Sequence, residues 1–173
     1  MDKTRKLMYM SLLVAMALML HIIERNIPVP FVTPGAKLGL TNLVTLIALY
    51  TLPSQWDTLK IIVVRLLLST IFGGSVSSLL YGGAGAMLSF LGMLFTKKVG
   101  KSAVSRIGVS AVGAVSHNIG QIIVASLIVQ HLGVILYLPI LSIAGITTGI
   151  FVGMSANYVI RHMTKINFFN KIS

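Results

Sequence analysis

The stretch IPVPFVTPGAKLGLTNLVTLIALY, residues 27–50, decides how this chain is organised. Its first part cannot be helical, because Pro28, Pro30 and Pro34 lack backbone donors and push the preceding residues into extended conformations. Its second part is apolar and predicts a helix that ends near residue 52. A connector this long and rigid is unusual between helices. We therefore expect it to form a lid or wall over a site near a membrane surface.

The composition of the chain is typical of an integral membrane protein. Of its 173 residues, 55% are hydrophobic and 10% are charged, whereas a soluble domain has about 25% charged residues. Its apolar runs predict an all-α bundle of six transmembrane helices that forms a single membrane domain. The expected helices cover residues 7–23, 38–52, 59–76, 84–96, 103–129 and 134–162, with the third turn inside 75–83.

The basic residues predict the orientation of this bundle. Eleven of them lie on the side of the two termini: Lys3, Arg5, Lys6, Lys60, Lys97, Lys98, Lys101, Arg106, Arg161, Lys165 and Lys171. Only Arg25 and Lys37 lie on the other side. Basic loops stay in the cytoplasm, so we expect both termini to be cytoplasmic and the proline-rich loop to face outward. The net charge of +11 is then explained by basic residues that orient the helices in the membrane. We therefore expect no nucleic-acid partner.

Several classes of chemistry are excluded by the residues. The chain has no cysteine, which removes disulfide and thiolate chemistry. It has no carboxylate pair to hold magnesium around a diphosphate, and no HExxH, Walker A or GxSxG motif. We therefore expect a protein that is not an enzyme, binds no metal or cofactor and does not hydrolyse ATP itself.

Arg65 is the one clear charge inside a predicted span. An intramembrane charge is a functional candidate by default, but an arginine near a helix end also snorkels to the interface. Both alternatives stay open. No carboxylate is expected within a span to pair with Arg65, because Asp57 lies in the adjacent turn.

The fifth predicted helix carries a cluster of long polar side chains. His117 and Gln121 are four residues apart, and Asn118 and Gln121 are three apart, so all three share one broad face. Such a face either contacts a ligand or forms hydrogen bonds between helices. Three long polar groups within two turns favour ligand contact slightly.

Further candidate ligand contacts lie near the outer ends of the predicted helices. They are Asn42, Lys37, His21, Phe31, Tyr81 and Tyr137. Each aromatic residue has an alternative role as an interfacial anchor. Arg25 and Lys37 outnumber Glu24 at this face, which mildly favours an anionic or electron-rich ligand.

Helix 7–23 carries small residues at a spacing of four, Ser11 and Ala15. Small residues at this spacing let another helix approach closely. The contact is either internal or made with a partner protein.

The run PGAKLGLTNLVTLIALY at 34–50, the glycine- and serine-rich run after Arg65, and SHNIGQ at 116–121 resemble a bacterial membrane family. That family is labelled Gx transporter or heptaprenyl diphosphate synthase component I, and the resemblance covers nearly the whole chain. In size and predicted topology the chain also resembles the substrate-binding S component of energy-coupling factor (ECF) transporters. That resemblance implies a partner subunit that couples transport to ATPases. It also implies that Ser11 and Ala15 meet the coupling subunit, although Met19, next in the series, is large.

The leading hypothesis is a substrate-capture subunit of ECF type in the bacterial cytoplasmic membrane. Its ligand is a small organic molecule, and an isoprenoid, a quinone precursor and a flavin-like compound are candidates. One alternative is a non-catalytic membrane subunit that accompanies prenyl diphosphate synthesis. Another is a structural partner in a membrane redox or lipid complex.

Overall fold

A computed structural model describes residues 3–26, 39–72 and 75–165 of the chain. Its elements are α1 (Lys3–Asn26), α2 (Asn42–Thr51), α3 (Gln55–Ile71), α4 (Val76–Gly100), α5 (Arg106–Val129), the 3-10 helix η1 (Leu132–Tyr137) and α6 (Leu138–Lys165). No strand occurs within these ranges, which confirms the all-α prediction. The proline-rich loop lies outside the described residues, and so do Phe31 and Lys37.

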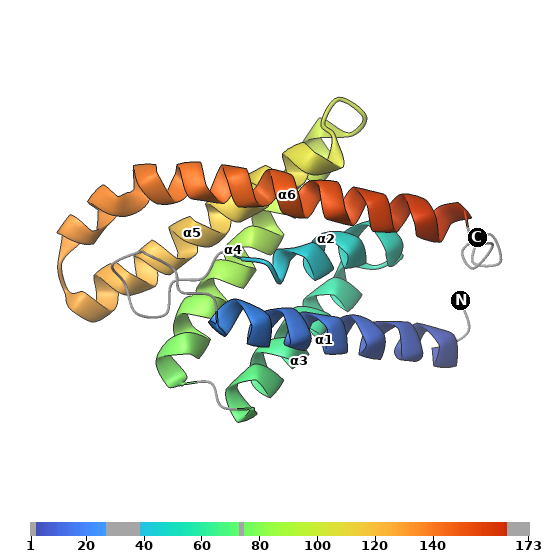
Figure 1. Ribbon diagram of the computed structural model, residues 1–173, viewed down its shortest axis with the longest axis horizontal. Coiled ribbons are helices and arrows are strands. Elements are labelled where there is room, and N and C mark those ends of the chain that lie inside the picture. The colour runs from blue at the N-terminus through green and yellow to red at the C-terminus, as the bar shows by residue number, and fades with distance from the viewer. Residues whose placement is uncertain (1–2, 27–38, 73–74, 166–173) are drawn as a thin grey trace.

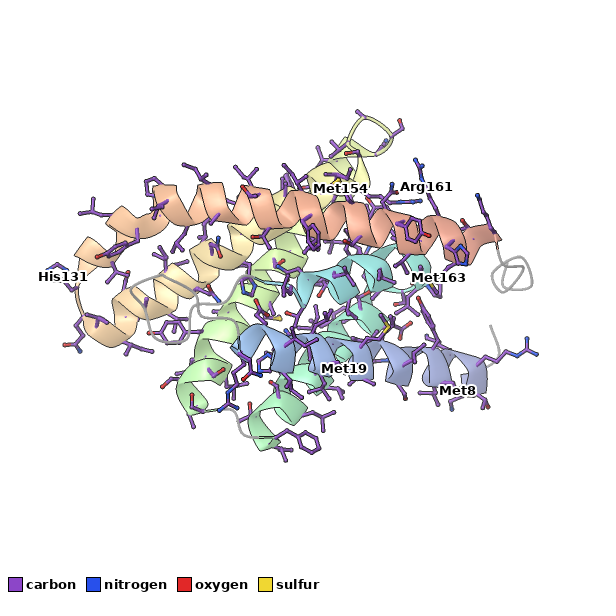
Figure 2. All side chains as sticks on the ribbon, viewed as in Figure 1. Met8, Met19, His131, Met154, Arg161 and Met163 are labelled. Carbon is purple, nitrogen blue, oxygen red and sulfur yellow. The ribbon has the colours of Figure 1, made fainter. Side chains whose placement is uncertain are left out.

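Four helical segments of the described chain are long and apolar enough to cross a membrane: α1, α4, α5 and the continuous segment Leu132–Lys165. Their outer faces are apolar, as expected for contact with lipid. Met8 and Met19 on α1 and Met154 on α6 are all exposed (Figure 2). The prediction of a membrane protein built from helices is thereby supported.

The second predicted span is wrong in length. Residues 40–41 form a turn, and α2 has only 10 residues. A helix of that length is about 15 Å long, half the thickness of a bilayer's hydrocarbon core. The apolar sequence was a poor guide here, because a helix buried inside a bundle is as apolar as one that crosses lipid.

The turn between α3 and α4 also differs from the prediction. Helix α4 begins at Val76, where the Ser75 side chain accepts the backbone N–H of Ser78 at 3.1 Å. A serine in this capping role starts a helix efficiently. Gly82, Gly83 and Gly85 are therefore helical and do not form a turn.

The other helix ends shift by smaller amounts. Helix α1 is longer than the expected 7–23 at both ends, and α5 begins at Arg106, where Ser105 caps it. The expected start of the last helix, residues 134–137, is 3-10 in conformation, and α6 continues to Lys165. At α5 the shift follows from the Ser105 cap, which hydropathy does not detect.

Helix α2 lies in the middle of the bundle, between α1 and α6 (Figure 1). It contacts each of the other five α-helices, and seven of its ten residues are buried. A helix this short is not stable alone in solution, so its neighbours must hold it.

Lys97 of α4 holds the carboxyl end of α2. Its Nζ donates to the Leu49 carbonyl oxygen at 2.6 Å and lies 4.5 Å from the centre of the Tyr50 ring. Arg106 approaches the same ring at 5.3 Å. A cation is favourable at this position because the carboxyl end of a helix carries partial negative charge.

Glycines set the close packing of α5 against its two neighbours. A Cβ atom at Gly149 of α6 would lie 2.7 Å from the Ala111 Cα atom of α5. A Cβ atom at Gly120 of α5 would lie 2.6 Å from the Ala84 carbonyl oxygen of α4. The spacing of Gly145, Gly149 and Gly153 by four is typical of membrane helices that pack backbone to backbone.

The helices alternate in direction, so that the Lys3 end of α1 and the Lys165 end of α6 lie at the same end of the bundle (Figure 1). Figure 2 shows Arg161 toward this end and His131 at the opposite end.

An ion pair joins α1 to α3, between Lys6 of α1 and Asp57 of α3 at 2.5 Å. Asp57 also pairs with Lys60 of its own helix at 3.5 Å.

Candidate functional site

One face of α1 turns polar as it approaches the amino end of α2. The buried residues of α1 are Tyr9, Leu13, Ala17, His21 and Glu24, at spacings of four and finally three. This periodicity is that of a single helix face. The face is apolar or aromatic as far as Ala17 and then brings an imidazole and a carboxylate into the bundle.

Glu24 lies in the last turn of α1 and is 2% exposed. Its Oε1 atom accepts the backbone N–H groups of Gly39, in a short hydrogen bond, and of Leu40, at 3.2 Å. These groups precede α2, where the aligned peptide dipoles favour negative charge. The predicted helix 7–23 left Glu24 outside, whereas Glu24 lies in the last turn of α1 and its side chain is buried in the bundle.

Arg65 of α3 provides the positive charge of the same region. It is 5% exposed, which excludes snorkelling to the surface, and it interacts electrostatically with Glu24. The expectation that no span carries a carboxylate to pair with Arg65 is wrong, because α1 continues past residue 23 and includes the buried Glu24. Two complementary charges inside the bundle offset part of each other's cost of burial.

Gly39 and Asn42 bring the amino end of α2 against α5. Gly39 has a φ angle of +81°, a conformation that favours glycine. A Cβ atom at Gly39 would lie 2.8 Å from the Asn42 Nδ2 atom and 3.5 Å from the His117 Cδ2 atom. Asn42 is 3% exposed, and its Nδ2 atom has no hydrogen-bond partner in the described part of the chain.

His117 and Gln121 form the α5 side of this polar cluster. The Gln121 Nε2 atom donates a hydrogen bond to the His117 Nε2 atom at 3.1 Å, in the imidazole tautomer whose Nε2 carries no proton. On the α4 side, a Cβ atom at Gly85 would lie 2.8 Å from the His117 Cε1 atom. Glycine at this position lets the imidazole pack directly on the α4 backbone.

Asn118 points elsewhere, toward α6. Its Nδ2 atom donates to the Leu141 carbonyl oxygen at 2.6 Å and lies beside Gly145. Consecutive residues of a helix point about 100° apart, so Asn118 separates from His117 although both are buried. Asn118 makes the bond between helices that the sequence left as an alternative to ligand contact.

We expect Asn118→Leu to lower the free energy of unfolding by about 0.6 kcal/mol, the average for a hydrogen bond between membrane helices. Ligand retention by the folded fraction should not change. Thermal unfolding in detergent measures the first effect, and Ser142→Ala on α6 provides a control. Reduced ligand retention with unchanged stability would instead place Asn118 in the ligand site.

His21 is buried and lines a polar cavity of about 300 Å³ between the ends of α1 and α3. Arg25, Asn26 and Ser69 contribute the other polar groups of its wall. The cavity contains basic groups and lies at the end of α1 that carries Glu24. Within the described ranges, no three His, Cys, Asp or Glu side chains are placed to hold a metal ion.

The two predicted tyrosines have different environments. Tyr81 is buried within α4, where it packs against Ala125 and Val134, so it does not lie in a turn as expected. Tyr137 is 41% exposed in η1, which is compatible with the interfacial role left open above.

Ser11 and Ala15 lie outside the bundle core. Both are exposed and line an apolar groove of about 430 Å³ between α1 and α3, with Lys60 on its wall. Internal packing does not account for them. The face of α1 that packs inside the bundle is the one that carries Leu13 and Ala17.

Sequence reasoning missed Glu24 and Gly39. The spacing of Leu13, Ala17, His21 and Glu24 was a usable pattern, since it extends one helix face to the carboxylate. No comparable pattern was available for Gly39, whose role depends on the approach of α5.

The fold and the cluster together define a class: a bundle of membrane-type helices around a short central helix whose amino end is enclosed by buried polar groups. The chain belongs to the heptaprenyl diphosphate synthase component I family, whose profile matches residues 13–159. No curated protein and no solved structure matches the chain.

Proposed function

We propose that the protein is a membrane-embedded subunit that captures a small organic molecule at the polar cluster around the amino end of α2. The observation that carries this proposal is the half-length helix α2, which begins among buried polar side chains instead of at a surface. Membrane transporters commonly bind their substrates where such interrupted helices begin. Polar groups at membrane depth are costly, and they commonly mark substrate sites.

The proposed ligand contacts are buried polar side chains of α2 and of the helices packed around it: His117, Gln121, Asn42, Arg65 and His21. Lys37, Phe31 and Tyr137 stay in the proposed set as contributors from the outer side. The surrounding charge, from Arg65 and the basic groups of the cavity beside His21, favours a ligand with an anionic or electron-rich group.

The proposed topology has two cytoplasmic termini and six helices that alternate in direction, with α2 crossing only half of the membrane, which makes the turn at η1 external. Because the chain lacks cysteine, Leu132→Cys and Ser102→Cys place single labels at the two opposite ends of the bundle. Both native side chains are exposed. A membrane-impermeant maleimide added outside intact cells should label the first variant and not the second. The reverse pattern would invert the topology.

The proposed partner is a coupling subunit with ATPases, as in ECF transporters, and the groove between α1 and α3 is its contact. We expect Ala15→Leu to fill part of this groove and to reduce copurification of the partner without loss of the folded protein. Met8→Leu, which changes an exposed residue of the same helix outside the groove, is the matched control. If Ala15→Leu and Met8→Leu recover equal amounts of the partner, the groove between α1 and α3 is not the contact.

A second candidate function is favoured by the name of the family. A synthase component without a magnesium-binding carboxylate pair would be a non-catalytic membrane subunit that accompanies a separate prenyl synthase.

One purification distinguishes the two candidates. The protein is isolated from its native membrane in mild detergent, and both its associated proteins and its retained small molecules are identified by mass spectrometry. ATPases together with a retained small molecule support capture for transport. A prenyl synthase without ATPases supports the accessory role and contradicts the transport proposal.

A further inference from the structure

We propose that the amino end of α2 is an anion-binding site now occupied by the chain's own Glu24, and that a carboxylate or phosphate of the ligand binds there in exchange for it. The exchange rests on the proposed capture function. The anion site itself is testable without it.

The donors at this site converge on one point. The N–H groups of Gly39 and Leu40 both donate to the Glu24 Oε1 atom. Arg65 adds a buried positive charge that interacts with the same carboxylate. Backbone N–H groups at a helix start, supported by the helix dipole, are a common means of binding phosphate and carboxylate groups.

A further donor shows that Glu24 does not use the whole site. The Asn42 amide is buried, and its Nδ2 atom is without a partner in the part of the chain that the structure describes. This atom lies beside Gly39, whose N–H group Glu24 accepts. Buried amide donors are rarely left unpaired in folded proteins. An anion with its oxygens at this helix end would accept from Asn42 as well as from the backbone.

Exchange is favoured over simultaneous binding because of charge balance. A second anion beside Glu24 would place two negative charges next to each other at the buried charge of Arg65. Departure of Glu24 without a replacement would leave Arg65 buried and uncompensated, which is strongly destabilising. Glu24 lies two residues from the end of α1, and the polar cavity lined by His21 and Arg25 adjoins the same turn. A small movement of that turn releases the site.

Chemical rescue tests the site. Glu24→Ala removes the resident carboxylate, and the melting temperature (Tm) of the purified variant is measured in formate, acetate, phosphate or chloride at equal ionic strength. We expect at least one of the oxyanions to raise the Tm saturably, by about 4–10 °C, above the value in chloride. A response to formate and acetate indicates a carboxylate ligand, and a response to phosphate alone indicates a phosphate ligand.

Glu24→Gln is the matched control, because its side-chain oxygen still fills the site and accepts from the backbone. It should show no specific response to these anions, and neither should the wild type. An absent response in Glu24→Ala, or an equal response in Glu24→Gln, overturns the proposal. If Glu24→Ala aggregates, recovery of folded protein becomes the readout. If none of the three oxyanions restores folded Glu24→Ala protein, the proposal is also overturned.

The result is separable from the capture function. An anion response in Glu24→Ala, with no small molecule retained by the wild type, leaves the anion site standing and contradicts capture. A retained ligand with no anion response contradicts the anion site and leaves capture standing.

Discussion

Gly149→Leu is expected to separate α5 from α6 and to cause one of the two largest losses of stability. A Cβ atom at this position would lie 2.7 Å from the Ala111 Cα atom and 3.0 Å from the Ala114 Cβ atom. The first of these is a backbone atom, so no side-chain rotation relieves the overlap. Overpacking a core costs up to about 3 kcal/mol and occasionally more, which corresponds to a fall in Tm of about 6–12 °C for a chain of this size.

Gly83→Leu is the matched control for this prediction. Gly83 is also helical and lies in α4, but a Cβ atom there meets nothing within 4 Å. Thermal unfolding of both variants in the same detergent should therefore show a large loss for Gly149→Leu and little change for Gly83→Leu. Equal Tm values would mean that α5 and α6 are not packed through their backbones.

Arg65→Met is expected to have an effect of similar size, for an electrostatic reason. It leaves the Glu24 carboxylate buried without the guanidinium that interacts with it. Breaking a buried ion pair costs about 3–5 kcal/mol, which is the upper limit for this variant because the Gly39 and Leu40 N–H groups still donate to Glu24. The double variant Glu24→Gln with Arg65→Met should recover much of the loss, since neither charge then remains.

Lys60→Met provides the control on the same helix. Lys60 is paired with Asp57 at 3.5 Å, but its side chain is 67% exposed. Exposed ion pairs contribute about 0–1 kcal/mol, so the Tm should change little. Equal losses in Arg65→Met and Lys60→Met, or no recovery in the double variant, would show that Arg65 does not act through its charge.

The candidate site was predictable only in part. His117, Gln121 and Arg65 were identified because long polar side chains are rare in apolar segments, and all are buried. The pattern did not distinguish ligand contact from bonding between helices. Asn118 shows why, since its role depends on the Leu141 carbonyl oxygen, which lies 23 residues away in the sequence.

The sequence by itself determined that the chain is a helical membrane-type bundle and which residues are polar within it. Hydropathy and basic flanks are local properties, so a single segment reveals them. Only the tertiary structure decided that α2 is a short central helix, that Glu24 turns inward and that Gly149 meets a backbone. Each of these depends on the distance between helices that are remote in sequence. That distance is set by packing, which apolar periodicity does not encode.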